Sequence, residues 1–305
     1  MIGPVAFLGT GLMGGPMCRN LARAGAEIRA WNRSPEKAQA IGEGVAVATS
    51  PAAAAQDAAA CIVMLSDGPT CRKILIDDGA AAALAPGALL IVMSSIGHQE
   101  AVDLAAEASG MGLRWIDAPV SGGTPAAAAG TLSIMAGGRA DDLDAAAPLL
   151  TPMGNVVHIG PAGTGALTKL INQITVASTI ATVAEAMLLA EQGGADPRKV
   201  REALMGGFAA SRILDLHGQR MIEGDFEPGG PARYQLKDTR AARDVAKSLG
   251  LDLPVLDLVD GLFDDLVAQG GGGLDHAALL LELRRRNGLA QGVEALSGGA
   301  ATAQD

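Results

Sequence analysis

One lysine stands alone in a long apolar segment of the chain. A glycine-rich turn at residues 160–165 opens into a helical pattern of about 28 residues, or roughly 42 Å. Lys169 is the only charged residue of this segment before Glu185, and Asn172 and Gln173 follow it three and four residues later. Side chains at these spacings share one face of a helix. Because an amine held by amides near a buried helix start can transfer protons, we expect the chemistry of this protein there.

A G-x-G-x-x-G motif near the start of the chain predicts a dinucleotide site. Its glycines are Gly9, Gly11 and Gly14, with Leu12 and Met13 between the last two, and it follows a short apolar run that begins at residue 4. In this motif the first glycine permits the tight turn, the second lets a pyrophosphate approach the backbone, and the third allows close helix–strand packing. The phosphates would lie on the N-terminus of the following helix.

The tip of the second expected strand, residues 27–31, favours NADP over NAD. An NAD-binding fold usually places an acid there for the ribose 2′-hydroxyl, whereas this chain has Asn32, Arg33 and Ser34. An arginine suits a 2′-phosphate by charge and by bidentate geometry. The alternative is that Arg33 is a solvated residue ahead of a helix, with NAD as the cofactor.

Further strand-like runs at 45–47, 61–65 and 89–93 alternate with alanine-rich helices. This alternation predicts a Rossmann-type, parallel, doubly wound α/β sheet that binds ligands at the carboxyl ends of its strands. Leu65, Ser66 and Ser95 follow two of these strands, so we expect them to border the cofactor. Plain helix caps are an equally good interpretation of the two serines.

A strand at 114–120 ends in Ser121, Gly122 and Gly123. A hydroxyl beside two unhindered N–H groups suits a carboxylate, although the same residues also form ordinary turns.

The length of 305 residues favours two domains. We expect a dinucleotide-binding domain at 1–161 and an all-helical substrate and oligomerisation domain at 162–290, joined by the long helix. The Gly/Ala/Ser/Gln-rich tail at 291–305 has too little apolar surface to pack and is predicted to be disordered.

Composition excludes several classes of protein. A net charge of −10 without a basic cluster argues against nucleic acid and anionic membranes as partners. The three cysteines lack metal-binding spacing and fit a reducing cytoplasm. We expect no metal site, because the histidines are scattered in sequence. They are His98, His158, His217 and His276. The apolar run at 174–190 contains Glu185, which favours a buried helix over a membrane span.

The motifs in order resemble those of the β-hydroxyacid dehydrogenases over about residues 4–287. Residues 7–14 look like the cofactor motif of that family and residues 117–123 like its substrate motif. Gly163-x-Gly165-x3-Lys169-x2-Asn172 is similar to its catalytic motif, and Lys237-Asp238 to a pair that its helical domain brings to the active site.

The resemblance implies reversible hydride transfer between NADP, or NAD, and a small β-hydroxy acid, semialdehyde or 2-oxo acid. Lys169 would be the general acid and base, and Asn172 would hold its ammonium or the substrate hydroxyl. Ser121, Gly122 and Gly123 would bind the substrate carboxylate, and Lys237 would add charge beside substrate and cofactor. Separately from the resemblance, the long apolar helix predicts a homodimer or homotetramer through the helical domain.

The chain resembles tartronate semialdehyde reductase at residues 172–173, 206–207, 210–211 and 226–229. At residues 31–34 and 64–67 it looks more like the NADPH-dependent glyoxylate/succinic semialdehyde reductases. The segments 95–98 and 229–231 depart from the family pattern near the expected pocket.

Three other functions stay open. An imine reductase of the same fold resembles the family without the lysine, and a non-catalytic assembly module would have lost it; Lys169 argues against both. A 6-phosphogluconate dehydrogenase would need a longer chain and a histidine where Gln173 stands.

Overall fold

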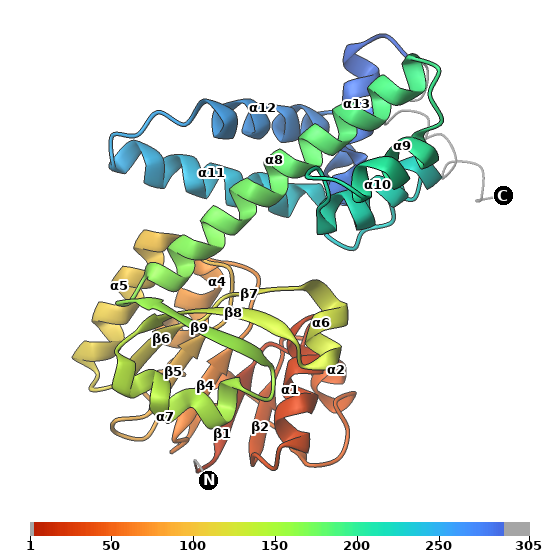
Figure 1. Cartoon of the computed structure of the whole chain (residues 1–305). Helices are drawn as coiled ribbons and strands as arrows, with labels where there is room; N and C mark the ends of the chain where they lie inside the picture. Colours follow the sequence, from red (N-terminus) through yellow and green to blue (C-terminus); the bar gives the residue numbers. More distant parts are fainter. Residues whose placement is uncertain (1–2, 290–305) are drawn as a thin grey trace, which may run out of the picture. The chain divides into compact units, whose positions relative to one another are not determined.

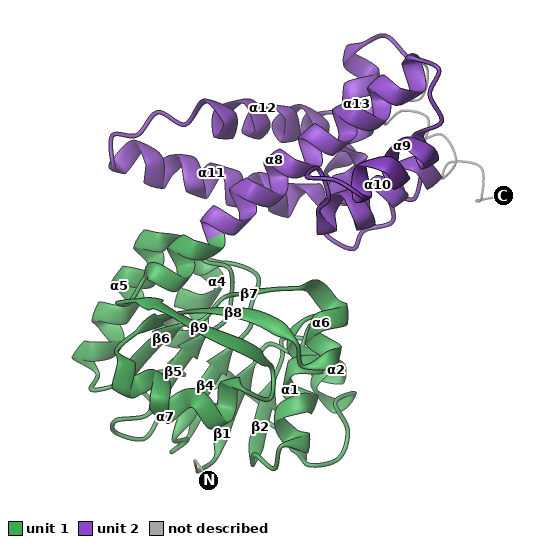
Figure 2. Ribbon diagram, in the orientation of Figure 1, with its two compact units in different colours: residues 1–169 green, residues 170–305 purple. Residues whose placement is uncertain are grey.

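The computed structural model describes residues 3–289 of two compact units, residues 1–169 and residues 170–305 (Figure 2). The expected tail at 291–305 lies outside the described residues. Helix α8 (Thr164–Gln192) begins in the first unit and continues as the first helix of the second. The boundary between the units therefore falls within a helix rather than in a loop.

The first unit is built on a nine-stranded sheet with the order β3-β2-β1-β4-β5-β6-β8-β7, and β9 pairs with β8. The strands are β1 (Val5–Leu8), β2 (Ile28–Trp31), β3 (Val45–Val47), β4 (Ala60–Val63), β5 (Leu89–Val92), β6 (Arg114–Asp117), β7 (Val120–Ser121), β8 (Leu132–Gly138) and β9 (Gly154–Gly160). The first six strands pair in parallel, as the sequence predicts.

The last part of the sheet is mixed rather than parallel. β8 runs antiparallel to both β6 and β7, and β9 is parallel to β8. A parallel crossover needs a dozen or more residues. The connection 122–131 between β7 and β8 is shorter, so the chain returns antiparallel.

Helices cover both faces of this sheet (Figure 1). They are α1 (Gly14–Arg23), α2 (Pro35–Gln39), α3 (Pro51–Ala55), α4 (Gly68–Arg72), the π-helix η1 (Lys73–Asp77), α5 (His98–Gly110), α6 (Gly123–Ala129) and α7 (Ala140–Leu150). In β1, Val5 and Phe7 join one hydrophobic cluster, while Ala6 and Leu8 join another. Because successive side chains of a strand point to opposite faces, two cores on one strand mean that both faces are buried.

The described part of the second unit consists of helices joined by loops, with one isolated bridge between Pro231 and Asp275. After α8 come α9 (Pro197–Met205), α10 (Arg212–Glu223), α11 (Ala232–Ser248), α12 (Pro254–Ala268), the 3-10 turns η2 (Gly271–Gly273) and η3 (His276–Ala278), and α13 (Leu279–Arg286). Ala177, Ile180 and Met187 of α8 pack in one core with residues of the later helices, among them Phe263 and Leu266.

Helix α8 is long and apolar enough to cross a membrane, and it is the one helix within residues 3–289 that passes this test. Buried helices of globular proteins have the same length and composition, and 44% of its most apolar window is buried. The residues of α8 that pack in the core of the second unit account for part of that apolar character.

Candidate active site

Two of the motif glycines are required by close backbone contacts. Gly9 has a φ of +98°, and a Cβ at this position would lie 2.2 Å from the Met64 carbonyl oxygen. A Cβ on Gly14 would lie 2.0 Å from the Gly9 carbonyl oxygen. Around Gly11, in contrast, a Cβ would meet no atom within 4 Å. The loop is thus closed on the protein side and open at the one glycine that a pyrophosphate must approach.

Helix α1 begins at this loop without a side-chain cap. Its N-cap residue, Met13, makes no capping hydrogen bond, and the Leu12 side chain is 82% exposed. N–H groups in the first turn of a helix together with its dipole favour an anion. This start fits a phosphate of a dinucleotide.

The loop is fastened to the end of β2 by Asn32. Its Oδ1 accepts a hydrogen bond of 2.9 Å from the Thr10 N–H, and its Nδ2 donates to the Ser34 carbonyl oxygen at 3.1 Å. Arg33, between these two residues, is exposed at the tip. The Thr10 hydroxyl is buried and has no hydrogen-bond partner in the structure. An orphaned hydroxyl in a phosphate loop also fits a bound cofactor.

Ser94, the residue before the expected Ser95, joins the loops that follow β4 and β5. The Leu65 N–H donates to the buried Ser94 hydroxyl at 2.7 Å. The Ser66 hydroxyl lies 2.8 Å from Asp67 Oδ2, inside its own loop, while the neighbouring Ser95 is partly exposed. Ser94 follows β5 just as Ser95 does, and only its burial tells the two apart.

The expected carboxylate-binding segment lies between β7 and α6. Ser121 ends β7 and is partly exposed, while Gly122 and Gly123 are exposed and have φ of +132° and +67°. These values lie in the region that favours glycine, so the turn holds two N–H groups without shielding side chains. Such a turn suits an anion.

A buried acid, Asp117, holds the start of the lysine-bearing helix. Its Oδ1 accepts from the Gly163 N–H at 2.7 Å, and its Oδ2 accepts from the Ala166 N–H at 2.8 Å. Burial raises the pKa of this carboxyl group, while those N–H groups and the Trp115 indole oppose the shift. On the other side of the turn, His98 Nδ1 lies 2.9 Å from the Gly163 carbonyl oxygen.

These contacts fix the first turn of α8 on the sheet of the first unit, one turn before Lys169. Lys169 itself is half-buried. The sequence places Asp117 in a motif but does not indicate that it anchors this helix.

The side chains that follow Lys169 on α8 meet helix α11. Asn172 Nδ2 donates to Gln173 Oε1 at 2.8 Å, and Gln173 Nε2 donates to Asp238 Oδ2 at 2.7 Å. Lys237 Nζ lies 3.3 Å from Asp238 Oδ1. Within the second unit, the fold therefore brings together the expected Asn172 and the Lys237-Asp238 pair.

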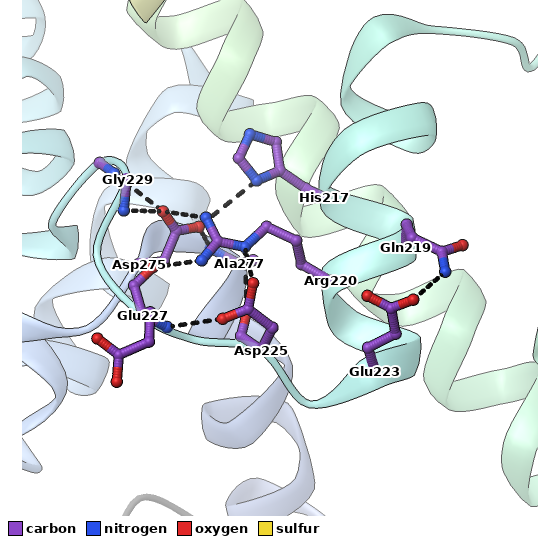
Figure 3. Close-up of polar contacts among 10 residues, drawn as sticks. His217, Gln219, Arg220, Glu223, Asp225, Glu227, Gly229, Asp275 and Ala277 are labelled. Atoms are coloured by element: carbon purple, nitrogen blue, oxygen red, sulfur yellow. Dashed lines mark hydrogen bonds and ion pairs between the residues drawn. The ribbon is translucent and has the colours of Figure 1, made fainter. Parts of the chain in front are cut away.

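Two of the four histidines are neighbours in the structure, although all four are scattered in the sequence. The rings of His217 and His276 lie 4.5 Å apart, and with Asp275 they form a cluster of metal-ligand type. The Asp275 carboxylate accepts from the N–H groups of Gly229, Gly230 and Ala277, and pairs with Arg220 at 3.0 Å (Figure 3). Since a carboxylate with these donors and a guanidinium is already satisfied, the cluster acts as a structural network.

Comparison with known proteins agrees with this geometry. The model of the NAD-binding domain of 6-phosphogluconate dehydrogenase matches residues 4–160. The NAD-binding model of NADP-dependent 3-hydroxyisobutyrate dehydrogenase matches residues 163–283. With the glycine loop, these matches define an NAD(P)-dependent oxidoreductase.

Named relatives cover nearly the whole chain. The 2-hydroxy-3-oxopropionate reductase of Escherichia coli is 40% identical over 94% of this chain and 99% of its own. The structure of Mycobacterium tuberculosis 3-hydroxyisobutyrate dehydrogenase with L-serine has a TM-score of 0.85 at 32% identity, covering 93% of this chain and 100% of that one. A 3-hydroxyisobutyrate dehydrogenase of Salmonella typhimurium gives 0.83 at 28% identity, covering 91% and 99%.

The chain belongs to the β-hydroxyacid dehydrogenase family. Its activity is the NAD(P)-dependent oxidation and reduction of small hydroxy acids and their oxo forms. The family, the fold class, the reaction class and the nicotinamide cofactor that the sequence predicts are thereby confirmed.

Proposed function

We propose that this enzyme interconverts a small carboxylate-bearing semialdehyde and the corresponding hydroxy acid, with Lys169 as general acid and base. One observation carries the proposal: Lys169 stands half-buried one turn after the first turn of α8, which Asp117 anchors to the dinucleotide-binding unit. The name of the Escherichia coli relative, a 2-hydroxy-3-oxopropionate reductase, supports a semialdehyde of this size as substrate.

The residues present fit a dinucleotide. Gly9, Gly11 and Gly14 form the loop, and the orphaned Thr10 hydroxyl and the uncapped start of α1 offer donors to the phosphates. When bound, the nicotinamide ring supplies or accepts the hydride. We assign further contacts with the dinucleotide as follows. Leu12 and Met13 would contact the phosphates, and Asn32, Arg33 and Ser34 the adenosine ribose. The nicotinamide half would contact Leu65, Ser66, Ser95 and Lys237.

Arg33 favours NADP over NAD. A guanidinium is always charged and forms paired hydrogen bonds with a phosphate, and the side chain is exposed at the strand tip where the ribose of a dinucleotide is bound in this fold. The neighbouring Asn32 is held by two backbone partners, so it keeps the tip in a fixed conformation.

In the reduction, Lys169 donates a proton to the carbonyl oxygen of the substrate, and in the oxidation it takes that proton back. Asn172 holds the lysine or the substrate hydroxyl. Ser121 and the N–H groups of Gly122 and Gly123 bind the substrate carboxylate, and Lys237 adds positive charge. Orientation of this kind, together with acid–base help, is what a protein contributes to hydride transfer.

We further propose a homodimer or homotetramer formed by the helical domain, residues 162–290, in the cytoplasm. Exposed apolar side chains gather around the α11–α12 connection. They are Leu249, Leu251, Leu253, Val255 and Leu258. Apolar surface of this kind is typical of interfaces. Cys18, Cys61 and Cys71 are free thiols, which fits a reducing compartment.

A substrate panel tests the proposed function. Purified enzyme would be mixed with NADPH or NADH and with glyoxylate or the semialdehyde of tartronate, succinate or methylmalonate, and cofactor oxidation would be followed by absorbance. The matching hydroxy acids with NADP test the reverse direction. We expect turnover of one semialdehyde with a preference for NADPH. Tight cofactor binding without turnover of any compound would refute the proposed substrate class.

A further inference from the structure

A chain of three polar side chains connects helices α8 and α11 inside the second unit. Asn172 donates to Gln173 at 2.8 Å, and Gln173 donates to Asp238 at 2.7 Å. Asp238 is 5% exposed, and the other two are half-buried. The backbone of Gln173 is also held, because the buried Gln235 Nε2 donates to its carbonyl oxygen at 3.1 Å.

The chemistry of Asp238 sets the direction of every bond in this chain. An ionised carboxylate only accepts hydrogen bonds, so Gln173 must turn its NH2 group towards Asp238. The Gln173 oxygen then points to Asn172, which must in turn donate its own NH2 group. The remaining polar atom of Asn172, Oδ1, is therefore an acceptor. Donor and acceptor types thus fix the orientations of both amides, independently of how their O and N atoms are assigned.

The orientation of Asn172 matters because its side chain is expected to accept a hydrogen bond from the Lys169 ammonium or the substrate hydroxyl. A lysine ammonium has three donors and no acceptor, and a substrate hydroxyl that is held for deprotonation also donates. An asparagine turned the other way would present an NH2 group to a cation. Lys169 lies one turn earlier on the same helix, at the spacing that places both side chains on one face.

We infer that Gln173 and Asp238 are positioning residues that fix the polarity of Asn172, so that it presents an oxygen to the catalytic lysine or to the substrate hydroxyl. This inference rests on the proposed function for Lys169 and Asn172. Lys237 Nζ lies 3.3 Å from Asp238 Oδ1, so each oxygen of the carboxylate has a donor and Oδ2 is directed to Gln173.

Two substitutions, made singly and together, reverse and then restore the donor-to-acceptor direction of these hydrogen bonds. In Asp238→Asn, the new amide can donate to the Gln173 oxygen. The Gln173 NH2 group then faces Asn172, and the Asn172 NH2 group, in place of its oxygen, faces the lysine or the substrate hydroxyl. In Gln173→Glu, two carboxylates face each other. In the double variant, the new amide at position 238 donates to one oxygen of the new carboxylate at position 173. The other oxygen of that carboxylate accepts from Asn172, as the Gln173 oxygen does in the wild type.

We expect each single variant to lose about tenfold or more in kcat, the size of one hydrogen bond to a charged group. The double variant should regain kcat to within about threefold of the wild type, because the two changes are coupled. Asp238→Asn also removes the ion pair between Lys237 and Asp238. Cofactor affinity, measured by fluorescence titration, reports separately on that loss. Asp260→Asn is the matched control. It changes another buried acid, bonded to Thr239 and Arg243, and should lower stability without lowering kcat.

A stability measurement decides whether the hydrogen bond between residues 173 and 238 forms, independently of any substrate. Thermal unfolding should show the double variant to be more stable than Gln173→Glu alone. A double variant no more stable than that single variant, or no more active than either single variant, would overturn the inference. A wild type that turns over no semialdehyde would instead refute the proposed function, and the stability comparison would still test the contact between residues 173 and 238.

Discussion

Lowering the pH from about 7 to about 5 should weaken the second unit through one histidine, His276. Burial lowers the pKa of His276 from 6.5 to about 4; Asp275 opposes this shift, while His217 and Arg220 add to it. Since the folded pKa lies below the unfolded one, the unfolded chain binds more protons between these values, and stability falls as the pH falls. With these two pKa values, the loss at about pH 5 is about 2 kcal/mol.

The neighbouring Asp275 does not contribute to the loss of stability between about pH 7 and about pH 5. Burial disfavours the charged form of Asp275, but the two histidine rings and the N–H groups of Ala277 and Gly230 outweigh burial and hold its pKa below the usual range. The stability that this acid contributes is present above its unfolded pKa of 3.8 and is lost only as the pH falls below that value. The interval from about pH 7 to about pH 5 therefore excludes a contribution from Asp275.

Denaturant unfolding followed by far-ultraviolet circular dichroism measures the effect, because the described part of the second unit is helical. Tryptophan fluorescence would miss it, since Trp31 and Trp115 both lie in the first unit. The variant His276→Gln should lose about 2 kcal/mol less than the wild type over this interval. His158→Gln, at an exposed histidine, should behave like the wild type. Identical pH dependence in His276→Gln and the wild type would refute the reasoning.

Two further substitutions test the first unit. Arg33→Asp should weaken NADPH binding by about 10- to 100-fold, the worth of a hydrogen bond to a charged group, and should spare NADH; fluorescence titration with both cofactors measures this, and an unchanged NADPH affinity would contradict the role of Arg33. Asp117→Asn leaves one side-chain oxygen for the N–H groups of Gly163 and Ala166, so the free energy of unfolding should fall by about 1.5–3 kcal/mol. Tryptophan fluorescence during denaturation would detect that loss, and wild-type stability would contradict it.

Local patterns in the sequence predicted the parts of the fold that depend on neighbours along the chain. The turn between β1 and α1 was predictable because glycine spacing alone encodes it. The end of α8 at Gln192 was predictable because a helical apolar period runs up to a Gly-Gly stop. The antiparallel return of β8 was not, since alternation of strands and helices does not show how short a connection is.

Contacts between distant residues account for what the sequence could not predict. Asp117 accepts from the Gly163 N–H, 46 residues later and just before helix α8, and no local capping pattern signals such a bond. His217 on α10 and His276 on η3 are far apart in the chain, and only the packing of the second unit makes them neighbours. The burial of Ser94 rather than Ser95 likewise depends on which side of the strand end faces the core.

Proton transfer by Lys169 is central to the proposed mechanism, and Lys169→Ala tests it most directly. Its kcat with the best semialdehyde of the panel should fall by about 10²- to 10⁴-fold, the usual contribution of general acid–base catalysis. NADPH affinity should stay unchanged. Lys199→Ala, at an exposed lysine of α9, is the matched control and should keep full activity. A Lys169→Ala enzyme that turns over at the wild-type rate would contradict this role.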